Sequence, residues 1–79
     1  MSNVEIVLPK WGTTMQEAEV TEVHVVVGQT VAEGDPIVTV ETDKVMTDVE
    51  SPYSGVITEM RADSGDVIPV GGVIAVVQQ

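Results

Sequence analysis

Lys44 is the residue of this sequence best placed for covalent chemistry. It follows Asp43 and lies between two valine-rich segments. An Asp-Lys pair fits the centre of a tight turn, because aspartate can bond its local backbone and lysine projects into water. An exposed lysine amine can be acylated to an amide. Most turn lysines are only solvated charges, however, so the turn by itself assigns no function.

Other reactive groups are scarce. Cysteine is absent and His24 is the only histidine, so the sequence lacks the ligands that a zinc site requires. No pairing of a nucleophile with a base is visible. None of the seven glycines forms a phosphate-binding pattern with a following helix. We therefore expect no catalytic residue, no metal site and no enzymatic activity of the chain itself.

The charge of the chain restricts its partners. Thirteen acidic residues oppose three basic ones, which gives a formal net charge of −10 over 79 residues. Such a surface repels nucleic acid and anionic membranes, so we expect neither as a partner and expect partners with basic or neutral surfaces. The apolar runs are far too short to cross a bilayer, and no signal peptide is visible. These features predict a cytoplasmic protein.

The composition predicts an all-β fold. Valine dominates the apolar residues and phenylalanine is absent, which favours an aliphatic core built of strand-forming side chains. The length fits one domain, residues 1–79. Alternating apolar residues and turn signals predict strands near residues 4–8, 18–26, 37–41, 45–50, 54–60 and 73–77, with very short strands near 30 and 67.

An internal repeat organises these strands. Shifting the sequence by 37 residues aligns Val20-Thr21-Glu22-Val23 with Ile57-Thr58-Glu59-Met60, and it superimposes glycines and isoleucines farther along, among them Gly28 on Gly65 and Ile37 on Ile74. Two such units can bury their apolar faces against each other as a quasi-twofold sandwich. The same shift places Lys44 opposite Val7. A twofold relation would put the Asp43-Lys44 turn at the end of the molecule far from both termini.

The residues around the lysine resemble a known modification site. The string Val40-Glu41-Thr42-Asp43-Lys44-Val45, followed by Ser51-Pro52 and Gly55-Val56-Ile57, is similar to the lipoylation site of lipoyl domains in the E2 acyltransferase components of 2-oxoacid dehydrogenase complexes. The opening Leu8-Pro9-Lys10-Trp11-Gly12 with Met15, and the close Pro69-Val70-Gly71, also resemble such domains. The resemblance implies a flattened barrel or sandwich of two four-stranded sheets related by a quasi-twofold axis.

The resemblance also implies a function. Lys44 would carry lipoate in an amide bond, with Glu41, Thr42, Asp43 and Val45 as flanking recognition residues. The implied partners are the thiamine-diphosphate-dependent E1, the E2 catalytic core, the flavoprotein E3 dihydrolipoamide dehydrogenase, and a lipoate ligase or octanoyltransferase. We expect the isolated domain to be monomeric. The opening and closing motifs look closest to those of acetoin dehydrogenase acyltransferases, with pyruvate and branched-chain complexes as alternatives.

Several alternatives remain open at this point. A biotinyl carrier shares the fold, but its lysine typically lies between two methionines, whereas Lys44 lies between Asp43 and Val45. An unmodified sandwich could serve as a structural adaptor. Three positions depart from the lipoyl pattern: Ala18 where glycine is common, Val23 where tryptophan is frequent, and Gln29 where aspartate is frequent. They lie outside the lysine hairpin and bear on partner identity. Because the sequence ends just after the last predicted strand, we also expect that a linker follows in a longer protein.

Overall fold

The described residues form two antiparallel sheets of four strands each. The computed structural model describes residues 2–9, 16–42 and 45–79. Its strands are β1 (Asn3–Val7), β2 (Glu17–Val23), β3 (Thr30–Val31), β4 (Pro36–Thr42), β5 (Val45–Glu50), β6 (Gly55–Met60), β7 (Val67–Pro69) and β8 (Val73–Gln78). One sheet has the order β1-β8-β6-β3 and the other the order β5-β4-β2-β7. The prediction of an all-β fold with two four-stranded sheets is confirmed.

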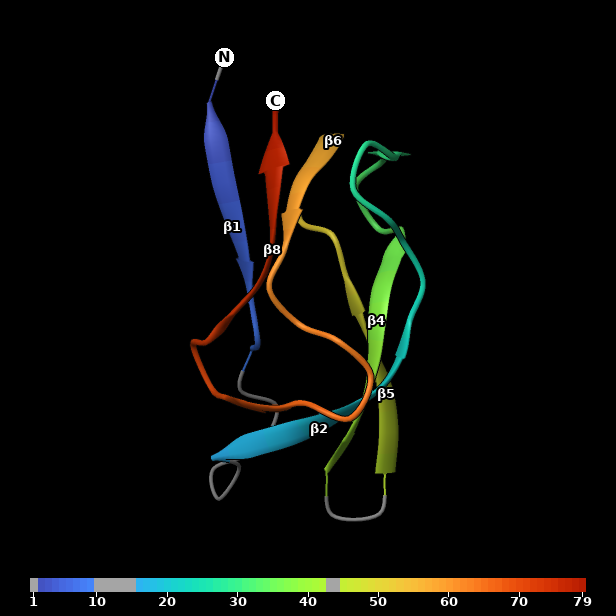
Figure 1. Ribbon diagram of the computed structural model, residues 1–79, viewed down its shortest axis with the longest axis vertical. Coiled ribbons are helices and arrows are strands. Elements are labelled where there is room, and N and C mark those ends of the chain that lie inside the picture. Colours follow the sequence, from blue (N-terminus) through green and yellow to red (C-terminus); the bar gives the residue numbers. More distant parts are fainter. Residues whose placement is uncertain (1, 10–15, 43–44) are drawn as a thin grey trace.

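The long axis of the molecule runs from the chain termini to the β4–β5 hairpin. Figure 1 shows β1 beginning and β8 ending at one end, and β4 ending and β5 beginning at the other. The molecule measures 36 × 21 × 18 Å along its principal axes. In the part of the chain that is described, no helix has the length and apolar character of a membrane span.

The 37-residue repeat is present in the backbone. β2 pairs with β4 as β6 pairs with β8, and both pairings skip one residue, Thr21 in the first and Thr58 in the second. The amide of Gly28 donates to the Ile57 carbonyl at 2.7 Å, and the amide of Gly65 donates to the Val20 carbonyl at the same distance. The two glycines have φ angles of 95° and 94°, in the left-handed region that other residues rarely adopt. The repeat therefore encodes a quasi-twofold axis.

β1 and β5 correspond to each other in the two halves, but not at the 37-residue offset of the repeat. Val7 pairs with Val73 and Glu50 pairs with Pro36, and these two partners are themselves related by the repeat. Val7 therefore corresponds to Glu50, so the alignment of Lys44 with Val7 is wrong. The cause is the connection that follows each strand. Ten residues separate Val7 from Ala18, whereas four separate Glu50 from Gly55, the repeat equivalent of Ala18.

The core between the sheets is aliphatic, as predicted. Ile37 and Ile74, which the repeat superimposes, are both 0% exposed. Each lies in the fourth strand of its half, and Val38 and Ala75 next to them are also fully buried. Isoleucine, leucine, valine and alanine make up the buried apolar cluster, and Tyr53 packs against it partly buried.

Two boundaries show how backbone geometry limits the strands. β2 ends at Val23 and not at residue 26, because the chain turns so that the Gln29 amide donates to the Val26 carbonyl at 3.1 Å. β6 begins at Gly55, where an added Cβ would overlap the Gln78 carbonyl and lie 2.7 Å from Cγ1 of Val77. Glycine at position 55 thus allows β6 and β8 to approach each other.

Candidate functional site

The candidate site is the end of the β4–β5 hairpin. β4 and β5 pair in continuous antiparallel register from Val38–Val49 to Thr42–Val45. The predicted attachment residue Lys44 and its neighbour Asp43 lie outside the described residues, and they are the two residues of the sequence between Thr42 and Val45. The structure therefore describes the two strands that lead to the predicted site.

The two strands that lead to this end are both packed into the aliphatic core. Val38 and Val40 of β4 are fully buried, and Val49 of β5 is 2% exposed, so the hairpin base is packed into the core. Burial of one face fixes the register of a strand pair, since a slip by one residue would turn every buried side chain to solvent. The described hairpin is thus a rigid support for whatever its end carries.

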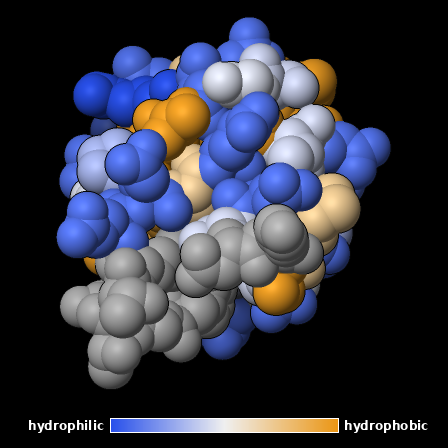
Figure 2. Space-filling view, turned by 90° about the horizontal axis from the view of Figure 1, so that it is seen from below, coloured by the Kyte–Doolittle hydropathy of each residue, from blue (hydrophilic) through white to orange (hydrophobic). Residues whose placement is uncertain are grey.

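The flanking side chains near the hairpin end face solvent. Glu41 is exposed, Thr42 is partly buried, and Val45 and Met46 are 58% and 59% exposed. Figure 2 looks onto this end of the molecule, where most of the described surface is hydrophilic and hydrophobic residues are scattered. Of the predicted recognition residues, Glu41, Thr42 and Val45 can be placed here, and Asp43 belongs to the undescribed pair.

Acidic residues gather beside the hairpin. Glu19 of β2 is the register partner of Glu41, and both side chains are exposed. Two like charges directly opposite each other across a strand pair reduce stability. Glu17 continues the acidic row on β2. A basic partner would therefore meet carboxylates from both β2 and β4 next to the hairpin end. Trp11 and Met15, which the sequence also singled out, lie outside the described residues.

His24 takes part in a polar chain that the sequence did not predict. The Thr39 hydroxyl donates to Asp48 Oδ1 at 2.7 Å, and His24 Nε2 lies 2.7 Å from the same hydroxyl oxygen. Because the single hydroxyl proton points to Asp48, Nε2 of His24 must be the donor in its own bond. Nε2 also lies 3.9 Å from the Glu22 carboxylate. These polar contacts connect the end of β2 with β4 and β5 on the outer face of the sheet.

This polar chain has the character of a structural link. Thr39 is 7% exposed and its hydroxyl has both partners, so the buried polar group is satisfied. The described residues contain no group of three or more histidine, cysteine, aspartate or glutamate side chains arranged for a metal ion. No signal in the sequence spacing could have found these hydrogen bonds, because they join His24, just after β2, to Thr39 of β4 and Asp48 of β5.

Comparison with known proteins identifies the family. The family model Biotin_lipoyl, described as "Biotin-requiring enzyme", matches residues 4–77. The chain belongs to the biotin/lipoyl domain family. This membership, together with the two-sheet fold, makes the chain a carrier domain of the lipoyl or biotinyl type.

The relatives are acyltransferase components. The chain is 41% identical over 70 residues to a dihydrolipoyllysine-residue acetyltransferase component of the pyruvate dehydrogenase complex from Corynebacterium glutamicum, covering 89% of this chain and 10% of that protein. It is 39% identical over 72 residues to the corresponding component of the acetoin cleaving system from Pseudomonas putida, covering 91% and 20% respectively. The chain thus spans between a tenth and a fifth of the length of these relatives.

A solved lipoyl domain has the same fold. The lipoyl domain of the 2-oxoglutarate dehydrogenase complex from Azotobacter vinelandii, known in solution, superimposes with a TM-score of 0.76 at 28% identity and covers 96% of both chains. The predicted resemblance to lipoyl domains of E2 acyltransferases is confirmed by these matches.

Proposed function

We propose that this domain is a lipoyl carrier whose attachment residue is Lys44. The supporting observation is the β4–β5 register, which closes at Thr42–Val45 and leaves Asp43 and Lys44 as the residues that join the strands. The end of β4 and the beginning of β5 lie at the end of the molecule opposite both chain termini (Figure 1). A domain tethered through its termini would therefore present this end to its partners.

The surroundings of the hairpin end fit a covalent arm. Glu41, Val45 and Met46 are exposed, so an arm attached between these strands would enter solvent without displacing core residues. In the attachment step, the uncharged lysine amine attacks the carbonyl carbon of an activated lipoyl or octanoyl donor. An amide forms, the donor's activating group leaves, and the amine loses a proton. The modification removes one positive charge and lowers the formal net charge of −10 by one unit.

The proposed task is transfer between enzymes. When bound, the dithiolane would accept an acyl group and electrons from a thiamine-diphosphate-dependent E1, pass the acyl group to coenzyme A at the E2 core, and be reoxidised by E3. The domain's own residues supply attachment, a rigid support and an acidic surface for recognition. Tethering raises the effective concentration of the carrier at each active site, which accelerates encounters without any new contact.

A biotinyl carrier is the competing function, because the family includes proteins that require biotin. Two observations favour lipoate. Asp43 and Val45 flank Lys44, whereas the biotinyl pattern has methionine on both sides. The relatives described above are dihydrolipoyllysine-residue acetyltransferases. Of the complexes, we propose an acetoin-type system on the opening and closing motifs. We also propose a cytoplasmic location.

The test is intact mass after enzymatic modification. The purified domain is incubated with lipoate, ATP and a lipoate ligase, in parallel with biotin and a biotin ligase. The sequence offers a matched control, because Lys10 is the only other lysine. We expect one lipoyl adduct on the parent domain and on the Lys10→Ala variant, and none on the Lys44→Ala variant. Biotin as the only adduct, or a lipoyl adduct that survives Lys44→Ala, would refute the proposal.

A second measurement identifies the complex. The lipoylated domain is offered to purified E1 enzymes of the acetoin and pyruvate types, and reductive acylation is followed by mass. We expect the higher kcat/KM with the acetoin-type E1. Glu41→Gln should raise KM for that E1 more than it lowers kcat, since an exposed carboxylate beside the hairpin would act in recognition. A higher kcat/KM with the pyruvate-type E1 would assign the domain to that complex instead.

A further inference from the structure

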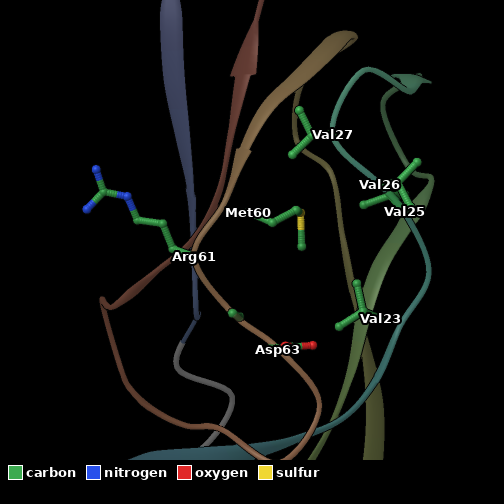
Figure 3. A pocket seen from close by; sticks show the side chains of 8 residues that line it. Val23, Val25, Val26, Val27, Met60, Arg61 and Asp63 are labelled. Atoms are coloured by element: carbon green, nitrogen blue, oxygen red, sulfur yellow. The ribbon is translucent and has the colours of Figure 1, made fainter.

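A groove opens between the end of β2 and the end of β6. It has a volume of about 420 Å³ and is lined from two segments, one with Val23 and residues 25–27 and the other with residues 60–63. The 37-residue repeat relates these segments, because it superimposes Val23 on Met60. The groove therefore lies where the two halves of the sandwich meet at the quasi-twofold axis (Figure 3). It is separate from the β4–β5 hairpin end.

The first segment presents unusually exposed apolar side chains. Val25 is 5% exposed and anchors the segment in the core, whereas Val26 and Val27 are 67% and 59% exposed. The partly buried Val23 and Met60 form the base of the groove. Single exposed apolar residues are normal on a protein surface, but adjacent ones beside an apolar recess are typical of an interaction site.

A single carboxylate points into the groove. Figure 3 shows Asp63 directed towards Val23, while the Arg61 side chain extends away from the groove. The Arg61 guanidinium is engaged elsewhere, since its Nε lies 3.0 Å from Glu59 Oε2. Asp63 Oδ1 accepts the Ser64 amide at 2.9 Å, and the hydrogen bonds among the described residues leave Oδ2 available. The groove thus combines apolar walls with an available negative charge.

These features define the chemistry of the occupant. Apolar walls favour aliphatic side chains, and the carboxylate favours a cation next to them. A second copy of this chain is disfavoured, because it would bring together two bodies of formal net charge −10 and a second Asp63. A basic partner is favoured by the same net charge.

We propose that this groove docks a segment of a partner protein in which two aliphatic side chains are followed by a lysine or arginine. The position suits a docking surface on a carrier. Val23 pairs with Val38, which lies four residues before Thr42 on β4. At about 3.3 Å per residue, about 13 Å of strand separates the groove from the hairpin end. A partner in the groove would leave the hairpin end free to visit active sites.

The test is an NMR titration of the ¹⁵N-labelled domain with three peptides. The probe is an acetylated and amidated Gly-Ser-Leu-Val-Lys-Ser-Gly. In the second peptide glutamate replaces lysine, and in the third two serines replace the Leu-Val pair. We expect chemical-shift changes confined to the amides of residues 23–27 and 60–63 for the first peptide, and weaker binding of both others.

Variants separate the apolar and charged contributions. The double variant Val26→Thr, Val27→Thr should weaken binding of the first peptide about tenfold, because two methyl groups lose their apolar contacts. Asp63→Asn should weaken it by up to about fivefold, as expected for one exposed charge pair. Val67→Thr is the matched control, since Val67 is 54% exposed and lies outside the groove, and it should leave the affinity unchanged.

Several outcomes would overturn the proposal. They are shift changes elsewhere on the surface, equal binding of the lysine and glutamate peptides, undiminished binding of the serine peptide, and no shift at millimolar peptide. A dimer in sedimentation equilibrium that Val26→Thr, Val27→Thr dissolves would assign the groove to a second copy instead. None of these results depends on lipoylation, so the docking proposal and the carrier proposal can fail separately.

Discussion

Truncation of the two central isoleucines tests the quasi-twofold core quantitatively. Ile37 and Ile74 are both 0% exposed and occupy equivalent places in the two halves. Replacing either by alanine removes three buried carbons, which costs about 2.4 kcal/mol at about 0.8 kcal/mol per methylene. The cavity that remains adds to this, and measured isoleucine-to-alanine changes in cores reach about 5 kcal/mol. We therefore expect Ile37→Ala and Ile74→Ala each to lower the free energy of unfolding by about 2.4–5 kcal/mol.

This loss is large for so small a protein. A chain of 79 residues has a free energy of unfolding of about 4–12 kcal/mol at 0.05–0.15 kcal/mol per residue. Urea denaturation followed by circular dichroism measures the change, and the melting temperature should fall by about 10 °C or more. Because the two sites are equivalent, we expect the two losses to agree within about 1 kcal/mol.

An exposed valine provides the control. Val26→Ala should change the free energy of unfolding by less than about 0.5 kcal/mol, because its side chain is 67% exposed. The reasoning would be refuted by a loss below about 1 kcal/mol at either isoleucine. A strong inequality between Ile37→Ala and Ile74→Ala would refute the equivalence of the two halves while leaving the burial argument intact.

Three further predictions concern backbone conformation and the outer face of the sheet. Gly28→Ala and Gly65→Ala should each destabilise the fold by about 1–2 kcal/mol in urea titrations, because both glycines have φ near 95°; equal stability of the variants and the parent would contradict this. Gly55→Ala should cost about 1–3 kcal/mol through overlap with β8, and calorimetry showing an unchanged melting temperature would exclude the clash. At a pH where the ring is neutral, ¹⁵N NMR should find His24 as the Nε2–H tautomer, and Thr39→Val should weaken that preference. An Nδ1–H tautomer in the parent would show that the hydroxyl bond is made differently.

Much of the fold could be predicted from the order of residues because its determinants are local or repeated. Alternation of valine and isoleucine with polar residues marks the strands, and glycines at a constant spacing mark the turns. The duplicated pattern implied that each half needs the other to bury its apolar face. The repeat thus indicates that Ile37 and Ile74 are buried, and both are 0% exposed in the structure.

The candidate site could be predicted in part. The assignment of the attachment site to Lys44 rests on the order of residues around it and stays a prediction, which family membership supports. The row of carboxylates on Glu19 and Glu41 could not be predicted, because it depends on which residues of β2 and β4 are register partners. A bulge at Thr21 shifts that register by one residue, and no local pattern marked it.

By itself, the sequence determined the strands, the duplicated unit, the aliphatic core and the lysine motif, since these depend on neighbouring residues and on spacing along the chain. Only the tertiary structure decided the rest. It assigned β1 and β5 an offset different from that of the repeat, because a connection between strands can lengthen without changing their pairing. It also joined His24 to Asp48 through Thr39 and placed Val26 and Met60 in the lining of one groove. Such contacts link residues that are distant along the chain, and they exist only once the two sheets have packed together.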